Sequence, residues 1–375
     1  MIYFDSAATT LEKPASVSKA VAYAVRHYSS PGRGGYRPAM EAGEVLYRCR
    51  EKAAKLFDVQ TPDQVVLTSS ATHGLNIAIR SLVKSGSTVV ISGYEHNAVT
   101  RVLYSIPDVT VKIAVADLFD AEGVYHAFDR EVTEDTDVVI CNHVSNVFGF
   151  IQPVEQISEL CKKRAKPLII DASQSAGTLP LSMTGLGAAF IAMPGHKGLY
   201  GPQGTGLLLC GREADPIIFG GTGSASIDQD MPDFLPDRLE AGTHNVCGAA
   251  GLLAGMNFVQ QKGPLEILRH EQWLCRNMRH RLSNIQNIRI FEGENQAGLF
   301  SFVLDGTDCE DVGDFLAGQG IAVRTGVHCA PLAHKSAGTL DRGTVRVSFS
   351  VFNRMDQVEH AVSSIQKIAE SGRAH

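Results

Sequence analysis

Apolar and polar positions alternate along the first 250 or so residues in a way that predicts strands and helices in turn. Short apolar runs that end at turn-forming residues predict strands, and apolar residues at helical spacing predict the helices between them. The runs that predict strands cover residues 64–67, 88–92, 110–115, 137–142, 167–171, 188–193 and 206–209. This alternation predicts an α/β fold with a seven-stranded, doubly wound and mainly parallel sheet.

A different pattern begins after about residue 250 and predicts a second, smaller unit. Its predicted helices cover residues 263–282, 311–318 and 356–369, and its predicted strands cover residues 288–291, 299–304, 321–324 and 344–350. A chain of 375 residues is too long for one ordinary hydrophobic core. We therefore expect a large domain of residues 13–252 and a small α+β domain of residues 1–12 and 253–375, with the active cleft between them.

The composition narrows the class of protein. The formal net charge is −6 and no block of basic residues occurs, so nucleic acid is not expected as a partner. The N-terminal residues do not resemble a signal peptide, and no apolar run approaches the roughly 20 residues that span a bilayer. The eight cysteines are scattered without a C-x-x-C pair, mostly in apolar stretches, as is typical of a reducing compartment. We expect a cytoplasmic protein that binds no membrane.

Two apolar runs end in a lysine and an aspartate. Lys197 closes the run that starts at Ala188, and Asp171 closes the run that starts at Pro167. A buried lysine costs free energy unless it reaches water or loses its proton, as Schiff-base lysines do. Open α/β folds bind ligands at the carboxyl ends of parallel strands. A lysine that can bond to an aldehyde and an aspartate that can pair with a pyridinium nitrogen indicate pyridoxal-phosphate chemistry. An exposed lysine and a helix-capping aspartate are the alternative.

Further strand-to-helix turns are expected at the same edge of the sheet, where the carboxyl ends of the parallel strands lie. Thr72, with the backbone N–H groups that begin its helix, forms an anion site suited to a phosphate, although an ordinary helix cap is the alternative. His96 is placed to stack on an aromatic ring or to move a proton, with a structural histidine as the alternative. Asn146 lies just after a further predicted strand and carries a side-chain amide group. The convergence of these turns is more specific than any one of them.

One cysteine differs from the others. Cys329 lies in a loop bounded by glycine and proline, with Arg324 and His328 close by, and cationic neighbours favour the thiolate that a nucleophile needs. A zinc site of His328, Cys329 and His334 is the alternative, but it lacks the paired spacing of structural zinc sites, so we expect no metal. Arg346 is suited to clamp a carboxylate, and a salt-bridged surface arginine is its alternative.

Motifs that contain these residues occur nearly from end to end of the chain. They cover residues 3–10, 95–96, 145–146, 171–174, 195–197, 239–243, 324–326, 328–330 and 346–348, with Asn353. In order and spacing the chain resembles the class V aminotransferase family of fold type I pyridoxal-phosphate enzymes, in its cysteine desulfurase and selenocysteine lyase branch. The short loop around Cys329 is similar to the group II form. The resemblance implies pyridoxal 5′-phosphate as the cofactor.

The resemblance also implies roles at the cofactor site. Lys197 binds the cofactor covalently and then moves the α-proton of the substrate, Asp171 pairs with the ring nitrogen, and Gln174 donates a hydrogen bond to the phenolic oxygen. His96 stacks over the ring. The groups that hold the phosphate are the backbone of Ala71 and the side chains of Thr72 and His196.

Substrate binding and assembly follow from the same resemblance. Asn146 approaches the ring and the substrate, Arg346 binds the substrate carboxylate, and Cys329 attacks the sulfur. Members of the family are homodimers. Residues 219–223, which include Thr222, resemble the segment that reaches the phosphate site of the partner.

Four residues depart from the family pattern. Pro194 stands where relatives usually have a serine or threonine that contacts phosphate, and His73 replaces a usual acidic residue. His244 stands in place of a proline, and Val327 replaces the first histidine of a His-His-Cys run. None of them removes an obligatory group, but together they leave the substrate preference open.

The expected function is that of a pyridoxal-phosphate-dependent cysteine desulfurase, which converts L-cysteine to L-alanine and takes the sulfur onto Cys329 as a persulfide. A thiol, for example on a sulfur-acceptor protein, then collects the sulfur. Selenocysteine lyase, which releases selenide from L-selenocysteine, is the close alternative. A plain aminotransferase or epimerase leaves Cys329 without a role. The alternative from another class is a non-catalytic scaffold, and the joint presence of Asp171, Lys197, Cys329 and Arg346 argues against it.

Overall fold

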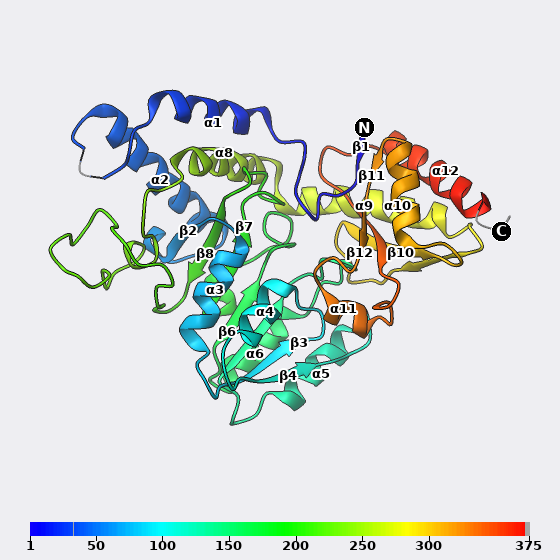
Figure 1. The fold of residues 1–375 in the computed structure, drawn as a ribbon, viewed down its shortest axis with the longest axis horizontal. Coiled ribbons are helices and arrows are strands. Elements are labelled where there is room, and N and C mark those ends of the chain that lie inside the picture. The colour runs from blue at the N-terminus through cyan, green and yellow to red at the C-terminus, as the bar shows by residue number, and fades with distance from the viewer. Residues whose placement is uncertain (33, 372–375) are drawn as a thin grey trace.

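The computed structural model describes residues 1–32 and 34–371 of the chain. Its central sheet consists of β2 (Val65–Thr68), β3 (Thr88–Ser92), β4 (Thr110–Ala114), β5 (Val138–Asn142), β6 (Leu168–Asp171), β7 (Phe190–Pro194) and β8 (Gly206–Cys210). The seven strands lie in the order β2-β8-β7-β6-β5-β3-β4 (Figure 1). Strand β8 is antiparallel to both of its neighbours, and the remaining strands all point the same way. The predicted α/β fold with a mainly parallel sheet is confirmed.

Both faces of this sheet are buried. Along β6, Ile169 packs into the core on one face and Ile170 into the core on the other, because successive side chains of a strand point to opposite faces. Helices α3 (Ala71–Leu82) and α4 (Asn97–Tyr104) cover the first face. The second face is covered by α2 (Arg37–Leu56), α5 (Ala121–Glu131) and α6 (Val154–Lys163). This double coverage explains why the strands are nearly continuous apolar runs in the sequence.

Some helices were not predicted. The longest of them, α8 (Val246–Lys262), packs against α1 (Ala15–His27) and α2. Because most of its residues are apolar or small on every side, α8 lacks the amphipathic stripe that reveals a surface helix in a sequence. At Gly255, an added Cβ would clash with the carbonyl oxygen of Leu199, so the small residue allows close approach of the loop that follows Lys197. The other unpredicted helices are α5, α7 (Met183–Leu186) and α11 (Pro331–Ser336), with short 3₁₀ turns at Pro62–Gln64 and Asp237–Leu239.

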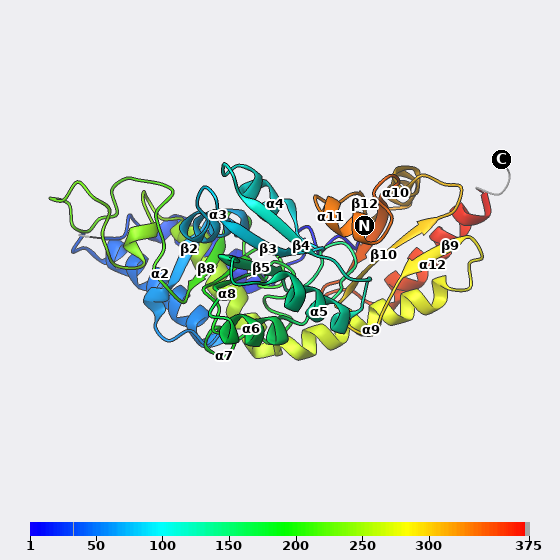
Figure 2. The ribbon, with the colours of Figure 1, turned by 90° about the horizontal axis from the view of Figure 1, so that it is seen from below.

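The second unit contains an antiparallel four-stranded sheet. Its strands are β9 (Ile288–Phe291), β10 (Leu299–Leu304), β12 (Arg324–Gly326) and β13 (Thr344–Ser348), in the order β12-β13-β10-β9. Helices α9 (Pro264–Leu282), α10 (Cys309–Gly318) and α12 (Met355–Ser371) accompany it. All three helices share one apolar core with Phe300 and Phe302 of β10. Figure 2 shows α9 running from beneath the central sheet out to α12. None of the helices in the described residues is long and apolar enough to cross a lipid bilayer.

The predicted strand at residues 321–324 is two strands in the structure. β11 (Ile321–Ala322) pairs in parallel with the N-terminal β1 (Ile2–Tyr3), whereas β12 pairs with β13. The chain changes partner at Val323, so one apolar run serves two sheets. The pairing of β1 places the N-terminus beside the second unit. The predicted domain boundary at residue 252 falls inside α8, and the division into domains stays a prediction.

Candidate active site

Several parallel strands end at one edge of the central sheet, and the residues that follow them line a cavity of about 190 Å³. Apart from Ala8, these residues lie at the ends of β2, β3, β5, β6 and β7 or in the segments that follow them, and these strands all point the same way. The predicted site residues that line the cavity are Ala71, Thr72, His96, Asn146, Asp171, Gln174, His196 and Lys197. The common direction of the strands brings them together, as expected for a ligand site of an open α/β fold.

Lys197 lies just beyond the end of β7. Burial lowers the pKa of Lys197 to about 8, although the negative charge of Asp171 acts in the opposite direction. More of this amine is therefore neutral near pH 7 than in an exposed lysine, which is what a nucleophilic amine requires. The turn is held by Thr10, whose backbone N–H (3.1 Å) and hydroxyl (3.0 Å) donate to the carbonyl oxygen of His196. Lys13, a residue that the sequence analysis missed, donates in turn to the Thr10 hydroxyl (2.8 Å).

Asp171 and His96 take up defined positions at the same edge. Asp171 is buried at the end of β6, where its Oδ1 accepts a hydrogen bond from the backbone N–H of Ser173 (2.9 Å). His96 caps α4, and its Nδ1 accepts from the backbone N–H of Ala98 (3.0 Å). Burial lowers the pKa of His96, so we assign a neutral ring that carries its proton on Nε2. The histidine is therefore both a helix cap and a wall of the cavity.

An anion site lies at the N-terminus of α3. Ser70 caps this helix by accepting from the backbone N–H of His73 (3.1 Å), and Ala71 and Thr72 line the cavity at the same place. The first N–H groups of a helix and the helix dipole favour a negatively charged ligand. His196 adds a neutral ring, because burial lowers its pKa to about 4. The residues predicted to hold a phosphate therefore lie together.

Arg346 is buried rather than on the surface, with 2% of its area exposed. Its Nη2 pairs with Asp5 (2.9 Å), its Nη1 donates to the carbonyl oxygen of Asn146 (2.8 Å), and its Nε has no hydrogen-bond partner among the described residues. Arg324 pairs with the same carboxylate (2.8 Å). Two guanidinium groups thus share one carboxylate, and the excess positive charge suits the carboxylate of a substrate. The sequence analysis gave no role to Asp5, although an acidic residue beside the apolar Phe4 was a usable signal.

Cys329 is exposed, and its loop is fixed to the rim of the cavity. The backbone N–H of Asn97, at the start of α4, donates to the carbonyl oxygen of Cys329 (2.8 Å), and Nδ2 of Asn146 donates to the carbonyl oxygen of His328 (2.8 Å). Arg324 and Cys329 interact electrostatically, and this interaction contributes to the raised pKa of Arg324. Burial lowers the pKa of His328 well below its usual value, so this ring is neutral. The expectation of two cationic neighbours is therefore corrected to one, Arg324.

The structure also bears on the zinc alternative. In the part of the chain that the structure describes, no three His, Cys, Asp or Glu side chains come together as metal ligands. Instead, Nδ1 of His328 lies 3.4 Å from Nε2 of His334, and Nδ1 of His334 lies 2.8 Å from the hydroxyl of Thr339. The two imidazoles are thus used in contacts with each other and with a hydroxyl group.

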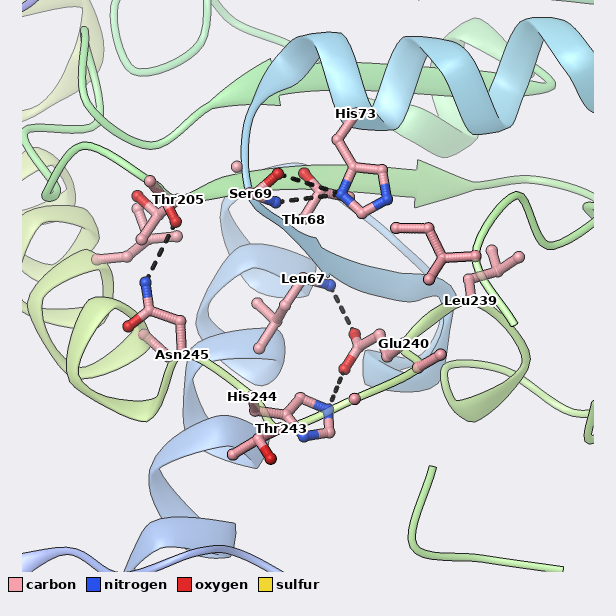
Figure 3. A pocket seen from close by; sticks show the side chains of 17 residues that line it. Leu67, Thr68, Ser69, His73, Thr205, Leu239, Glu240, Thr243, His244 and Asn245 are labelled. Carbon is pink, nitrogen blue, oxygen red and sulfur yellow. Dashed lines mark hydrogen bonds and ion pairs between the residues drawn. The ribbon is translucent and has the colours of Figure 1, made fainter. Parts of the chain in front are cut away.

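Two of the departures from the family pattern line a second cavity, of about 320 Å³ (Figure 3). Nε2 of His244 lies 2.6 Å from Oε2 of Glu240, and the other oxygen of this carboxylate accepts from the backbone N–H of Leu67 (2.6 Å). On another wall of the cavity, Nδ1 of His73 accepts from the backbone N–H of Ser69 (3.3 Å). Both histidines therefore make contacts with neighbouring loops and strands outside the first cavity.

The remaining predicted residues lie in different places. Pro194 lines the first cavity, and Val327 is 41% exposed beside Cys329. Thr222 lies outside the first cavity of its own chain, and its hydroxyl group contacts that of Ser224 (3.1 Å). The predicted reach of Thr222 to a partner's phosphate site stays a prediction.

This combination of a doubly covered sheet, a lysine at a strand end and an anion site at a helix N-terminus agrees with the comparison to known proteins. The family model for class V aminotransferases matches residues 2–360. The chain therefore belongs to the class V aminotransferase family, and its α/β fold is that of fold type I pyridoxal-phosphate enzymes.

Its similarity within that family is to cysteine desulfurases. A probable cysteine desulfurase of Methanothermobacter thermautotrophicus is 31% identical over 99% of this chain and 95% of its own length. The solved structure of a cysteine desulfurase from Thermococcus onnurineus NA1 has a TM-score of 0.88 at 28% identity, covering 99% of this chain and 95% of that one. The cysteine desulfurase CsdA from Escherichia coli has a TM-score of 0.87 at 25% identity, covering 98% and 94%. The predicted resemblance to the cysteine desulfurase branch is confirmed.

Proposed function

We propose that this chain is a cysteine desulfurase that uses pyridoxal 5′-phosphate to convert L-cysteine to L-alanine and takes the sulfur onto Cys329 as a persulfide. The observation that carries the proposal is the hydrogen bonding of the Cys329 loop to Asn97 and Asn146, at the rim of the cavity that Lys197 and Asp171 line. Similarity over the whole chain to named cysteine desulfurases supports the same activity.

The residues of the first cavity fit the proposed cofactor in charge and hydrogen bonding. Oδ1 of Asn146 is buried and has no hydrogen-bond partner among residues 1–32 and 34–371, so it is available to a ligand. Lys197 would bond to the aldehyde, Asp171 would pair with the ring nitrogen, and the N-terminus of α3 would hold the phosphate. When bound, the cofactor withdraws electrons from the Cα atom of an amino acid substrate.

Gln174 and His96 would complete the ring site. Nε2 of Gln174 donates to the carbonyl oxygen of Ala7 (3.0 Å), and an amide group has a second N–H that remains for the phenolic oxygen. His96 lines the same cavity with a neutral ring, which suits stacking on the cofactor. His196 and Thr72 would bind the phosphate with Ala71.

The carboxylate of L-cysteine would bind to Arg346. Its Nε atom is buried and has no hydrogen-bond partner in the part of the chain that the structure describes, and Asp5 leaves the Arg324 and Arg346 pair with one net positive charge. Because Nη1 of Arg346 donates to the backbone of Asn146, the carboxylate site and the cavity share one residue. This contact would orient the substrate between the arginine and the cavity.

Lys197 and Cys329 would act one after the other. The neutral amine of Lys197 accepts the proton from the substrate Cα, and its lowered pKa keeps it able to return a proton near neutral pH. The Cys329 thiolate then attacks the substrate sulfur. A sulfur–sulfur bond forms, the Cβ–S bond breaks, and its electron pair stays with Cβ, which takes up a proton. Lys197 returns the proton to Cα, and L-alanine leaves. A thiol of an acceptor protein finally takes the outer sulfur from the Cys329 persulfide.

The proposal includes a homodimer in which Thr222 of one copy reaches the phosphate site of the other. Support comes from the large exposed apolar side chains Ile218, Phe219 and Ile227 on the same loop, which a partner would cover. Sedimentation velocity of the wild type and of Phe219→Ser tests this assembly. A wild type that stays monomeric at micromolar concentration would contradict it. The cytoplasmic location stays a prediction.

The central test is the formation of L-alanine from L-cysteine by the cofactor-loaded protein with a reductant. We expect Cys329→Ser to lose activity by about 100-fold or more, because the nucleophile is gone. The matched control is Cys247→Ser, which changes a half-buried cysteine on α8 and should keep the wild-type rate.

Three other outcomes would contradict the proposal in different ways. If Cys329→Ser kept the wild-type rate of alanine formation, Cys329 would not be the nucleophile. If this variant released selenide from L-selenocysteine while the wild type preferred that substrate, the lyase would replace the desulfurase. A wild type that failed to bind pyridoxal phosphate would support the scaffold.

A further inference from the structure

The two residues of the nucleophile loop share an unusual backbone conformation. His328 and Cys329 have φ values of 52° and 54°. Side chains with a Cβ rarely adopt this left-handed region, and two such residues in succession persist when the surrounding contacts determine them. The contacts that hold this pair therefore decide how the Cys329 thiol is presented.

One set of contacts comes from the unit that carries the cofactor cavity. The backbone N–H of Asn97 donates to the carbonyl oxygen of Cys329 (2.8 Å), and Nδ2 of Asn146 donates to that of His328 (2.8 Å). Both hydrogen bonds hold the backbone of the pair. They leave the side chain of His328 to be fixed from the other side.

A chain of side chains on that other side fixes the His328 ring. Nε2 of His328 lies 3.3 Å from the carbonyl oxygen of Arg324, and Nδ1 of His328 lies 3.4 Å from Nε2 of His334. Nδ1 of His334 in turn lies 2.8 Å from the hydroxyl group of Thr339. The two rings are parallel within 4°, with their centroids 5.6 Å apart.

One proton arrangement of two neutral rings satisfies all three of these side-chain contacts. A carbonyl oxygen only accepts, so Nε2 of His328 carries the proton and Nδ1 accepts from Nε2 of His334. Nδ1 of His334 must then accept from the Thr339 hydroxyl. Burial favours neutral rings, since His328 is 8% exposed and His334 is 0% exposed, and it lowers the pKa of His334 to about 4. Both nitrogen atoms of His328 are thus used, and this ring is not a base for Cys329.

We propose that His334 and Thr339 are positioning residues for Cys329: through His328 they hold the left-handed pair that presents the thiol to the cavity. The inference rests on the proposed role of Cys329 as the nucleophile. It adds two residues on and after α11 that neither the sequence motifs nor the cavity lining identify. Their loss should slow sulfur transfer and leave the proton step at Cα intact, because Lys197 and the first cavity are untouched.

The test compares Thr339→Val with Thr339→Ser in the cofactor-loaded enzyme. Thr339→Val keeps the shape and removes the hydroxyl donor, and we expect kcat for alanine formation to fall about fivefold with KM for L-cysteine nearly unchanged. Thr339→Ser restores the donor and should restore kcat. Exchange of the L-alanine Cα hydrogen in D₂O, followed by NMR, should keep the wild-type rate in both variants.

A second variant and a control guard against general destabilisation. His334→Phe keeps a flat ring and removes both hydrogen bonds, and it should lower kcat at least as much as Thr339→Val. Hydrogen–deuterium exchange of the peptide that contains Cys329 should become faster in these two variants. Thr136→Val changes another buried threonine, whose hydroxyl accepts from the backbone N–H of Thr133 (3.0 Å) at the far end of β5, and should change neither readout.

The outcomes separate this inference from the proposed function. A wild-type kcat in Thr339→Val, no rescue by Thr339→Ser, or a parallel loss of Cα exchange would overturn the positioning role. None of these results bears on the activity of Cys329→Ser, which tests whether Cys329 is the nucleophile. If Cys329→Ser were fully active, the proposed function would fail whatever the Thr339 variants did.

Discussion

The cofactor cavity and the Cys329 loop are built on different principles. The cavity residues follow strands of one sheet, whose direction and two buried faces determine where each side chain lies. The Cys329 loop belongs to the second unit and owes its conformation to a few hydrogen bonds from both units. The difference implies that the proton step at Cα and the transfer of sulfur respond to different substitutions.

The largest effect is expected from Lys197→Ala, which changes a residue of the cofactor cavity and leaves the Cys329 loop intact. The substitution removes both the covalent anchor and the base, so alanine formation should fall by about 1,000-fold or more and Cα exchange should fall with it. Lys84→Ala, at an exposed lysine, is the control. Cα exchange that survives in Lys197→Ala would mean that another group moves the proton.

A smaller effect is expected at Arg346, which contacts both regions through Asp5 and Asn146. Arg346→Lys keeps the charge but loses the planar set of donors, so KM for L-cysteine should rise about 10- to 100-fold. Steady-state kinetics measure this change, with the exposed Arg354→Lys as control. An unchanged KM would remove Arg346 from substrate binding.

The lowered pKa of Lys197 predicts a pH profile in the cofactor-free protein. Acetylation of Lys197 by acetic anhydride requires the neutral amine, so its rate should rise with pH and level off above about 8, whereas an exposed lysine continues to about 10.4. Because the charge of Asp171 raises the pKa of Lys197, Asp171→Asn should move the midpoint to lower pH. Peptide mass spectrometry measures both profiles. A midpoint at the ordinary lysine value of about 10.4 would show that the amine is not buried.

The smallest effect is expected from Val327→His, which restores the residue that is usual in the family. Val327 is 41% exposed, and exposed substitutions commonly change free energies by less than about 0.5 kcal/mol, or roughly twofold in rate. The assay is kcat for alanine formation. A larger change in kcat would mean that residue 327 contributes to sulfur transfer, in addition to His334 and Thr339.

Much of the cofactor cavity could be predicted from the local sequence pattern, whereas less of the Cys329 loop could be. The turns at Thr72, His96 and Asp171 each end an apolar run, which is information that a sequence contains. The neutral state of His328 could not be predicted, because it depends on burial and on the position of His334. Helix α8 was missed for a related reason: it is buried on most sides and shows no amphipathic stripe.

The sequence by itself determined the alternation of strands and helices, which predicts a mainly parallel sheet, and the residues at the strand ends, because strand periodicity is a local property. The tertiary structure decided the pairing of Asp5 with Arg324 and Arg346, which lie 319 and 341 positions away. It also decided the contacts of the His328 and His334 rings and the left-handed conformation of Cys329. These features depend on contacts between units, and local sequence carries no record of which distant groups will meet or which of them will lose water.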